Sequence, residues 1–142
     1  MRTWLYERLA TDPELIPTLG VDETEVRTRI HPRRSEETIV LPTPYIIFGL
    51  GNDTNEDLAE DTDHEAHRQF FTIWIHDEGP TFTTIDDLIP IIKARLQNAQ
   101  DSDAGVTMVR WLETSSEFNN ETYKTVFRYC RFQAIRSRSY AT

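Results

Sequence analysis

The residues best placed to do chemistry lie in one acidic segment between two apolar stretches. Residues 53–65 hold seven carboxylates and no Lys or Arg, and His64-Glu65-Ala66-His67 closes the segment. Two His residues at i and i+3 can share a helical face and bind zinc. A zinc site usually needs a third ligand. The catalytic helix motif is His-Glu-x-x-His, and the pair in this chain does not match it. A nearby Asp could supply a ligand, but the polarity of the segment favours a solvated surface, and no metal site is predicted.

Other motifs in the chain resemble ligand or catalytic sites only in part. The start of the acidic segment is similar to a calcium loop, but Leu58 stands where an EF-hand needs Gly. Gly49-Leu50-Gly51 follows an apolar run but lacks the third glycine of a dinucleotide fingerprint. Cys130 lies among aromatic residues in a predicted strand, which is typical of an inert buried thiol. The sequence therefore predicts no catalytic residue, no cofactor and no enzyme activity.

The composition restricts the partners that the chain can have. Its 142 residues fit one domain, and the net charge is −9 with only Lys93 and Lys124 as lysines. A protein that grips nucleic acid through phosphates needs clustered Lys and Arg, so specific DNA binding is not expected. No segment has the length of a signal peptide or a membrane span, and the single cysteine favours a reducing compartment. We expect a soluble protein made inside the cell, with no membrane partner.

The elements that must position these residues can be read from hydrophobic spacing. A helix is expected over Arg2–Ala10, followed by a short helical turn that Asp12 caps and Gly20 ends. Apolar residues alternate with charged ones around residues 26–30, which permits an edge strand there. Residues 39–41 could form another short strand. Residues 45–50 read as a strand apolar on both sides, which enters a turn at 52–53.

The second half of the chain continues with strand, helix, strand and strand. Strands are expected at residues 68–76, 106–113 and 123–136, and a turn at residues 115–120. A helix should open at Thr84 with a capping-box-like Thr-x-x-Asp, and Pro90 should kink it or delay its start. Its buried stripe is predicted to comprise Leu88, Ile91, Ile92, Ala94 and Leu96.

These elements predict an α+β fold: a mostly antiparallel four- to five-stranded sheet with helices packed on one face. The whole chain, 1–142, is expected to be a single domain with an acidic loop at about 51–66. A basic C-terminal strand and tail follows at about 123–142. Two surfaces could serve for binding. The acidic patch comprises Asp53, Glu56, Asp57, Glu60, Asp61 and Asp63, and the basic candidates are Arg128, Arg131, Arg136 and Arg138.

Three stretches of the chain resemble a known family. They are the opening Met1-Arg2-Thr3-Trp4-Leu5-Tyr6-Glu7-Arg8-Leu9, then Tyr45-Ile46-Ile47-Phe48-Gly49-Leu50-Gly51-Asn52-Asp53, and Phe71-Thr72-Ile73-Trp74-Ile75-His76-Asp77. Together they are similar to tail terminator (tail completion) proteins of long-tailed actinobacteriophages. The resemblance extends from Met1 to about Leu96, whereas the last third agrees only in its strand-rich character.

The resemblance implies a structural virion protein without cofactor or enzymatic activity. Its members form a homohexameric ring that caps the tail tube, stops tube polymerisation and forms the head-tail joining surface. It implies the major tail tube protein and the head-tail connector protein as partners, and DNA that passes through without specific binding. The implied location is the head-proximal end of the virion tail, and the host cytoplasm during assembly. It assigns no functional residues.

The charged surfaces fit such a ring, because a cyclic contact needs two different patches on each subunit. The basic strand could contact phosphate, but packing against an acidic protein surface is favoured. The acidic patch could line a lumen that repels DNA, form the tube-facing rim, or only keep the protein soluble. Two other functions stay open: a head-to-tail connector (neck) protein of the same virion, and a small acidic regulator that binds a basic partner.

Overall fold

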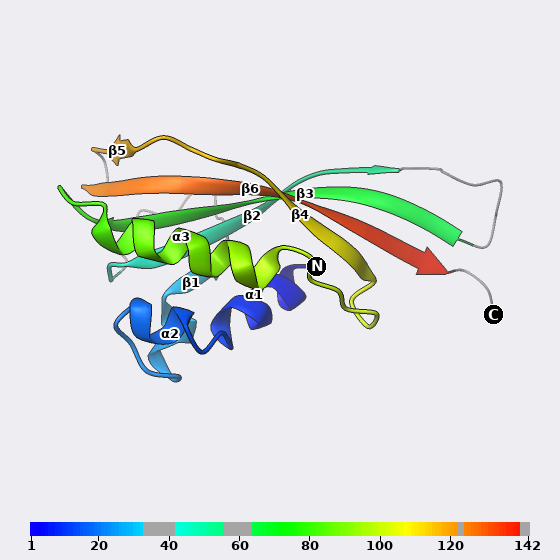
Figure 1. The fold of residues 1–142 in the computed structure, drawn as a ribbon, viewed down its shortest axis with the longest axis horizontal. Helices are drawn as coiled ribbons and strands as arrows, with labels where there is room; N and C mark the ends of the chain where they lie inside the picture. The colour runs from blue at the N-terminus through cyan, green and yellow to red at the C-terminus, as the bar shows by residue number, and fades with distance from the viewer. Residues whose placement is uncertain (33–41, 56–63, 122–123, 140–142) are drawn as a thin grey trace.

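The computed structural model describes residues 1–32, 42–55, 64–121 and 124–139. Positions 52–55, 64–66 and 137–139 are described by their backbone alone. Across these ranges a single six-stranded sheet carries three α-helices and one 3₁₀-helix, and the helices lie on one side of the sheet (Figure 1). No helix in these ranges is long and apolar enough to cross a membrane.

The elements follow one another along the chain as two short helices, a 3₁₀-helix, two strands, a long strand, the longest helix and three strands. Their bounds are α1 Arg2–Ala10, α2 Leu15–Thr18, the 3₁₀-helix η1 Glu25–Thr28, β1 Ile30–Pro32, β2 Tyr45–Asn55, β3 His64–Glu78, α3 Thr83–Leu96, β4 Val106–Thr114, β5 Phe118–Asn120 and β6 Thr125–Ser139.

The sheet has the order β1-β2-β3-β6-β4, and β5 also pairs with β6. The β1–β2 pair is parallel, and every other pair is antiparallel. Strands β4 and β5 pair with successive parts of β6. Strand β5 pairs with residues 125–127 of β6, and β4 pairs with residues 130–136. The mixed α/β class agrees with the sequence prediction. The sheet has six strands rather than four or five, because β1 and β5 have only three residues each and give no alternation signal.

The hydrophobic core lies between the helices and one face of the sheet. In β3, Phe71, Ile73 and Ile75 are at most 1 % exposed, and the alternate residues of the strand point to the other face. Phe132 of β6 stacks on Phe71 with ring centroids 5.2 Å apart, which joins the two central strands inside this core. The same core holds the buried stripe of α3, which comprises Ile85, Leu88, Ile89, Ile92 and Leu96.

The start of α3 differs from the sequence prediction. The helix begins at Thr83, and Phe82 precedes it without a side-chain capping bond, so the capping box at Thr84 is wrong. Pro90 lies inside the helix and does not delay its start. Two predicted stripe residues also differ, since Ile91 is half-buried and Ala94 is exposed.

The N-terminal turns follow the expected capping chemistry. Asp12 is buried, and its Oδ1 accepts hydrogen bonds from the backbone N–H groups of Glu14 (2.8 Å) and Leu15 (3.2 Å). Gly20 has a φ of 75°, a left-handed value that favours glycine at a helix end. The edge strand expected around residues 26–30 is wrong, because Val26 turns inward in η1 and the strand begins only at Ile30. The strand expected at residues 39–41 lies outside the described residues.

Strands β2, β3 and β6 extend together beyond the helices and form a three-stranded arm (Figure 1). The predicted acidic loop at 51–66 therefore begins and ends in strand, and its middle, residues 56–63, lies outside the described residues. No turn occurs at Asn52-Asp53, because β2 continues through a register shift between Leu50 and Asp53. A Cβ at Gly51 would lie 3.3 Å from that of Phe70, so glycine permits this close approach.

Candidate assembly surface

The basic strand β6 distributes its arginines over two faces of the sheet. Arg128 faces the helices, where its Nη1 donates to Oδ1 of Asp86 on α3 at 2.9 Å. Its Nε and Nη2 both donate to the carbonyl oxygen of Ser115, at 3.1 and 2.9 Å. This guanidinium joins the first turn of α3 to the segment that links β4 and β5. Arg128 thus has structural contacts within its own chain.

Arg131 lies on the opposite face. Its Nη1 donates to Oε1 of Glu113 at 3.1 Å, and the two side chains are 47 % and 49 % exposed. An ion pair this exposed contributes little to stability, so the Arg131 guanidinium can readily exchange Glu113 for another carboxylate. Arg131 is therefore available to a partner in a way that Arg128 is not.

The other two arginines lie in the arm. Arg136 is half-buried, and its Nε is buried without a hydrogen-bond partner among the described residues. Burial, followed by the charges of Arg136 and Arg2, lowers the pKa of the Met1 amino group. Of Arg138 only the backbone is described, and it pairs with Glu65 of β3. That all four arginines serve subunit or tube contacts stays a prediction.

The acidic patch has only one member within the described ranges. Asp53 lies in β2 with its Cα opposite Gln69 of β3. The remaining members, Glu56, Asp57, Glu60, Asp61 and Asp63, lie outside the described residues. The topology places the ends of the acidic segment in β2 and β3, and β3 pairs with the basic end of β6 in the same chain. A lumen or rim role for these carboxylates stays a prediction.

The sheet face away from the helices carries a row of stacked rings that crosses four strands. Tyr45 of β2 stacks on His76 of β3 at a centroid distance of 4.8 Å, and His76 stacks on Phe127 of β6 at 5.0 Å. Phe118 of β5 completes the row at 5.2 Å from Phe127. Phe118 is 40 % exposed, so the row ends in an accessible ring. We call this side of the sheet the open face.

His76 is held neutral in the middle of the row. It is only 7 % exposed, and burial lowers its pKa to about 4. Its Nδ1 lies 3.0 Å from the Thr125 hydroxyl, which can donate or accept according to the tautomer. The ring therefore acts as an aromatic spacer with one hydrogen bond, and sequence reasoning did not single it out.

Three large hydrophobic side chains are exposed in the part of the chain that the structure describes. They are Met108 and Leu112 of β4, at 40 % and 37 %, and Phe118 of β5. Arg110 lies between Met108 and Leu112 in β4 and is exposed. Its Cα is opposite that of Gln133 in β6, and Arg131 is two residues before Gln133 on the same strand. Sequence reasoning missed these residues. The signal was present in the broken alternation of Val106–Thr114, where bulges occur at residues 106–108 and 111–113.

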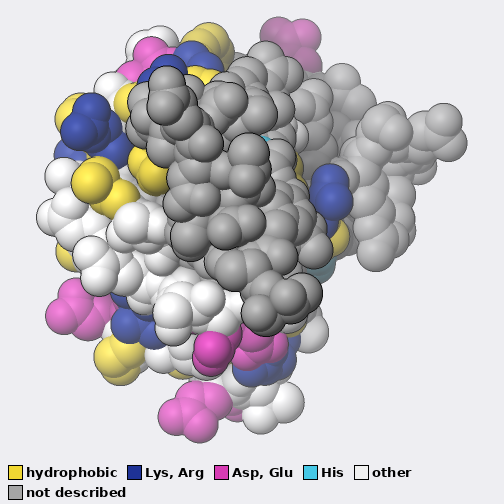
Figure 2. Space-filling view, turned by 90° about the vertical axis from the view of Figure 1, so that its right-hand side faces the viewer, with side chains coloured by type: hydrophobic (Ala, Val, Ile, Leu, Met, Phe, Trp, Pro, Cys, Tyr) yellow, Lys and Arg dark blue, Asp and Glu magenta, His cyan; other side chains and the backbone are white. Residues whose placement is uncertain are grey.

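Figure 2 shows the molecule from the end where the arm extends. Described hydrophobic and Lys or Arg side chains lie next to one another on the left-hand side of this view, and acidic side chains lie at its upper, left-hand and lower margins. The lower margin is the side of the N-terminal helices in Figure 1. Side chains of both charges thus occur toward the upper and the lower margin of this view.

No metal or catalytic cluster is formed by the described residues. Among them, no group of three or more His, Cys, Asp or Glu side chains could hold a metal ion. The pair His64 and His67 lies in β3, so the segment is a strand and not the helix that such a pair would need. Burial raises the pKa of the Cys130 thiol, which lies 3.6 Å from the Thr114 hydroxyl. This thiol has the inert environment that the sequence predicted.

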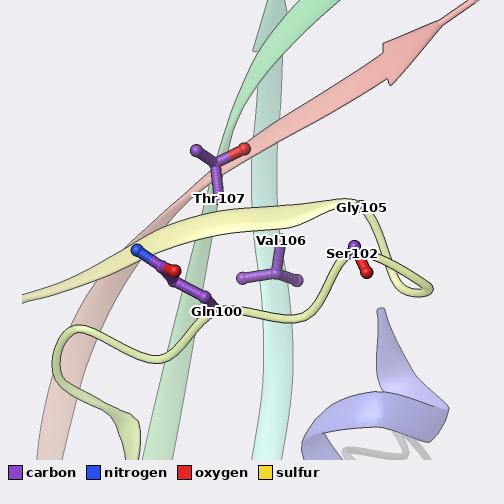
Figure 3. A pocket seen from close by; sticks show the side chains of 5 residues that line it. All are labelled: Gln100, Ser102, Gly105, Val106 and Thr107. Carbon is purple, nitrogen blue, oxygen red and sulfur yellow. The ribbon is translucent and has the colours of Figure 1, made fainter.

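A cavity of about 310 Å³ lies where the loop after α3 leads into β4 (Figure 3). Its lining comes from Gln100 and Ser102 of the loop and from Gly105, Val106 and Thr107. These residues offer amide and hydroxyl groups, with no acid, base or thiol among them. The cavity has the character of a surface hollow.

Comparison with known proteins gives a match in structure. No family model and no curated protein matches the sequence. The fold is similar to that of a chain in the virion of a native gene transfer agent (GTA) particle, with a TM-score of 0.66 and 17 % sequence identity. The similarity covers 94 % of this chain and 92 % of that chain, so it extends over nearly the whole of both chains. At this identity the match shows a shared fold.

Proposed function

We propose that the chain is a structural virion protein that acts as a tail terminator. One observation carries the proposal: nearly the whole chain shares its fold with a chain of a gene transfer agent virion. The three sequence stretches that resemble tail terminator proteins support the same function. In this proposal the single domain forms a ring at the head-proximal end of the tail and works through subunit contacts alone, without catalysis.

The two sides of the sheet suit such a ring. Helices cover one side of the sheet (Figure 1), and the open face has exposed apolar and basic side chains. A subunit with two different sides can make a head-to-tail contact with its neighbour, and such contacts close into a ring when the rotation permits. The six-fold number comes from the resemblance. The ring would contact the major tail tube protein on one side and the head-tail connector protein on the other.

The acidic segment has a place in this proposal. Carboxylates repeated around a ring would repel phosphate, so DNA could pass without specific binding. The net charge of −9 agrees with this role. We propose the acidic patch as the lining of the lumen or of the tube-facing rim.

The experiment that tests the function is tail-tube assembly in the presence of the purified chain. We expect tubes of the same virus's tube protein to stop growing when the chain is added, and rings to be visible at tube ends by negative-stain electron microscopy. Light scattering should show a discrete oligomer, alone or on the tube. Unchanged tube lengths together with a chain that stays monomeric would contradict the proposal.

A neck protein of the same virion is the second candidate, because the matched particle is a whole virion. The same assay separates the two functions. A terminator binds tube ends without any other protein, whereas a connector binds the head-side assembly and leaves tube growth unchanged. Binding only to the head-side assembly would therefore replace the terminator with the connector.

A further inference from the structure

A basic and apolar patch lies on the outer strands of the sheet. We define the β4–β6 patch as Met108, Arg110 and Leu112 of β4 with Arg131 and Gln133 of β6. Arg110 and Gln133 are directly opposite each other, so their side chains share a face with that of Arg131. Met108 and Leu112 leave 40 % and 37 % of their surface exposed. Burying this apolar surface would favour a contact.

The charge of the patch is only weakly compensated within the chain. Arg131 pairs with the exposed Glu113, and Arg110 has no ion-pair partner among the described residues. Two guanidinium groups thus face one nearby carboxylate on a protein whose net charge is −9. An acidic partner can approach here without the repulsion that the rest of the surface imposes.

The other side of the molecule carries the complementary charge. We define the acidic corner as Asp22, Glu23 and Glu25, at the start of η1. All three are exposed, and none is among the ion pairs of the described residues. Asp22 accepts hydrogen bonds from the backbone N–H groups of Thr24 and Glu25, at 2.9 and 2.8 Å, which fixes the turn. The corner belongs to the helical side, opposite the open face (Figure 1).

We propose that the β4–β6 patch of one copy binds the acidic corner of a second copy. The patch and the corner lie on opposite sides of the sheet, so each copy can use both at once, as a head-to-tail ring requires. Arg110 and Arg131 meet the carboxylates of the corner, while Met108 and Leu112 become buried between the copies. This inference rests on the proposed function and names the subunit contact that the ring would use.

The first test is self-association of charge-reversed variants, measured by analytical ultracentrifugation. The double variant Arg110→Glu, Arg131→Glu should raise the dissociation constant by at least about tenfold, because it places carboxylates opposite carboxylates. Glu23→Arg, Glu25→Arg should weaken association similarly. The matched control is Arg2→Glu, which changes an exposed arginine of α1 outside both surfaces and should leave association unchanged.

The decisive test combines the two reversed surfaces. An equimolar mixture of the two double variants should associate as heteromers, although each is weak alone, because the exchanged charges are complementary again. Urea unfolding of each variant checks that the monomer still folds. If both variants are folded and associate like the wild type, or if the mixture shows no recovery, the proposed contact is wrong.

The tail-tube assay separates this inference from the proposed function. If the wild type caps tubes and the Arg110→Glu, Arg131→Glu variant caps them equally well as a ring, the function stands and the contact is overturned. If the wild type neither associates nor caps tubes, both fail. Duplex DNA at low salt is a further probe. Wild-type binding that the double variant loses, without any change in self-association, would assign the patch to phosphate and overturn the contact.

Discussion

The two faces of the sheet are built by alternate residues of the same strands but differ in what they bury. On the helix face, Ile73 and Ile75 are fully buried, whereas their neighbours Thr72 and Trp74 on the open face are half-buried. The helix face closes the core, and the open face keeps accessible rings and guanidinium groups. The two faces thus differ in how deeply their residues are buried, so substitutions on the helix face should change stability more than substitutions at exposed positions of the open face.

The largest effect should come from the helix face. Ile73→Ala removes a fully buried side chain between the sheet and α3 and should lower the free energy of unfolding by about 2–5 kcal/mol. Thr72→Ala, one residue away on the open face, should change it by less than about 0.5 kcal/mol. Urea unfolding of both variants measures the contrast, and equal effects would contradict the division between the faces.

The buried ring of the open face should respond to pH. The pKa of His76 is about 4 in the folded chain and about 6.5 when unfolded, so the unfolded chain binds the extra proton first. The contribution of neutral His76 to the free energy of unfolding is therefore fully present above pH 6.5. It is lost as the pH falls toward 4, which lowers the free energy of unfolding by up to about 3 kcal/mol. Comparing urea unfolding of the wild type and His76→Gln at pH 7 and 4.5 isolates it. Equal pH dependence in the two proteins would show that His76 is not held neutral.

Arg128 tests whether a basic-strand residue on the helix face is structural. Arg128→Met keeps the apolar stem but removes the hydrogen bonds to Ser115 and Asp86, so unfolding should become easier by about 1–3 kcal/mol. Association should stay unchanged in ultracentrifugation. A variant that is as stable as the wild type but associates poorly would move Arg128 to the assembly surface.

The smallest effect is expected at the exposed ion pair of the open face. Glu113→Gln should lower stability by less than about 0.5 kcal/mol, because both partners are about half-exposed. It frees Arg131 and removes a negative charge, so self-association should tighten. Light scattering at several concentrations checks this sign, and weaker association would show that Glu113 itself contacts the neighbour.

Much of the element order was predictable because it depends on local chemistry. The periodicity of Trp4, Leu5 and Leu9 predicted α1, and the Asp12 side chain and Gly20 marked the turns that the structure shows. The apolar run at Tyr45 and the aromatic run at Phe71 predicted the two strands that pair as β2 and β3. These signals need only a few neighbouring residues, so no tertiary contact was required to find them.

The candidate surface was less predictable because its members come together only through strand pairing. Arg128 and Arg131 looked equivalent in sequence, but a three-residue step along a strand puts them on opposite faces, one bonded inside and one exposed. Arg110 was not recognised, since its relation to Arg131 depends on the β4–β6 register and on two bulges. The ends of the acidic segment extend β2 and β3, where pairing overrides a polar, turn-like sequence.

The sequence by itself determined the α+β class, the main helices and strands, the acidic balance and the absence of a recognisable catalytic motif. These properties depend on composition and on short-range periodicity. Only the tertiary structure decided which residues share the open face, that β5 and β4 follow each other along β6, and that the basic patch and the acidic corner lie on opposite sides. Faces and neighbours in a sheet are set by register between strands far apart in the chain, and a one-residue shift in register exchanges every side chain between the two faces.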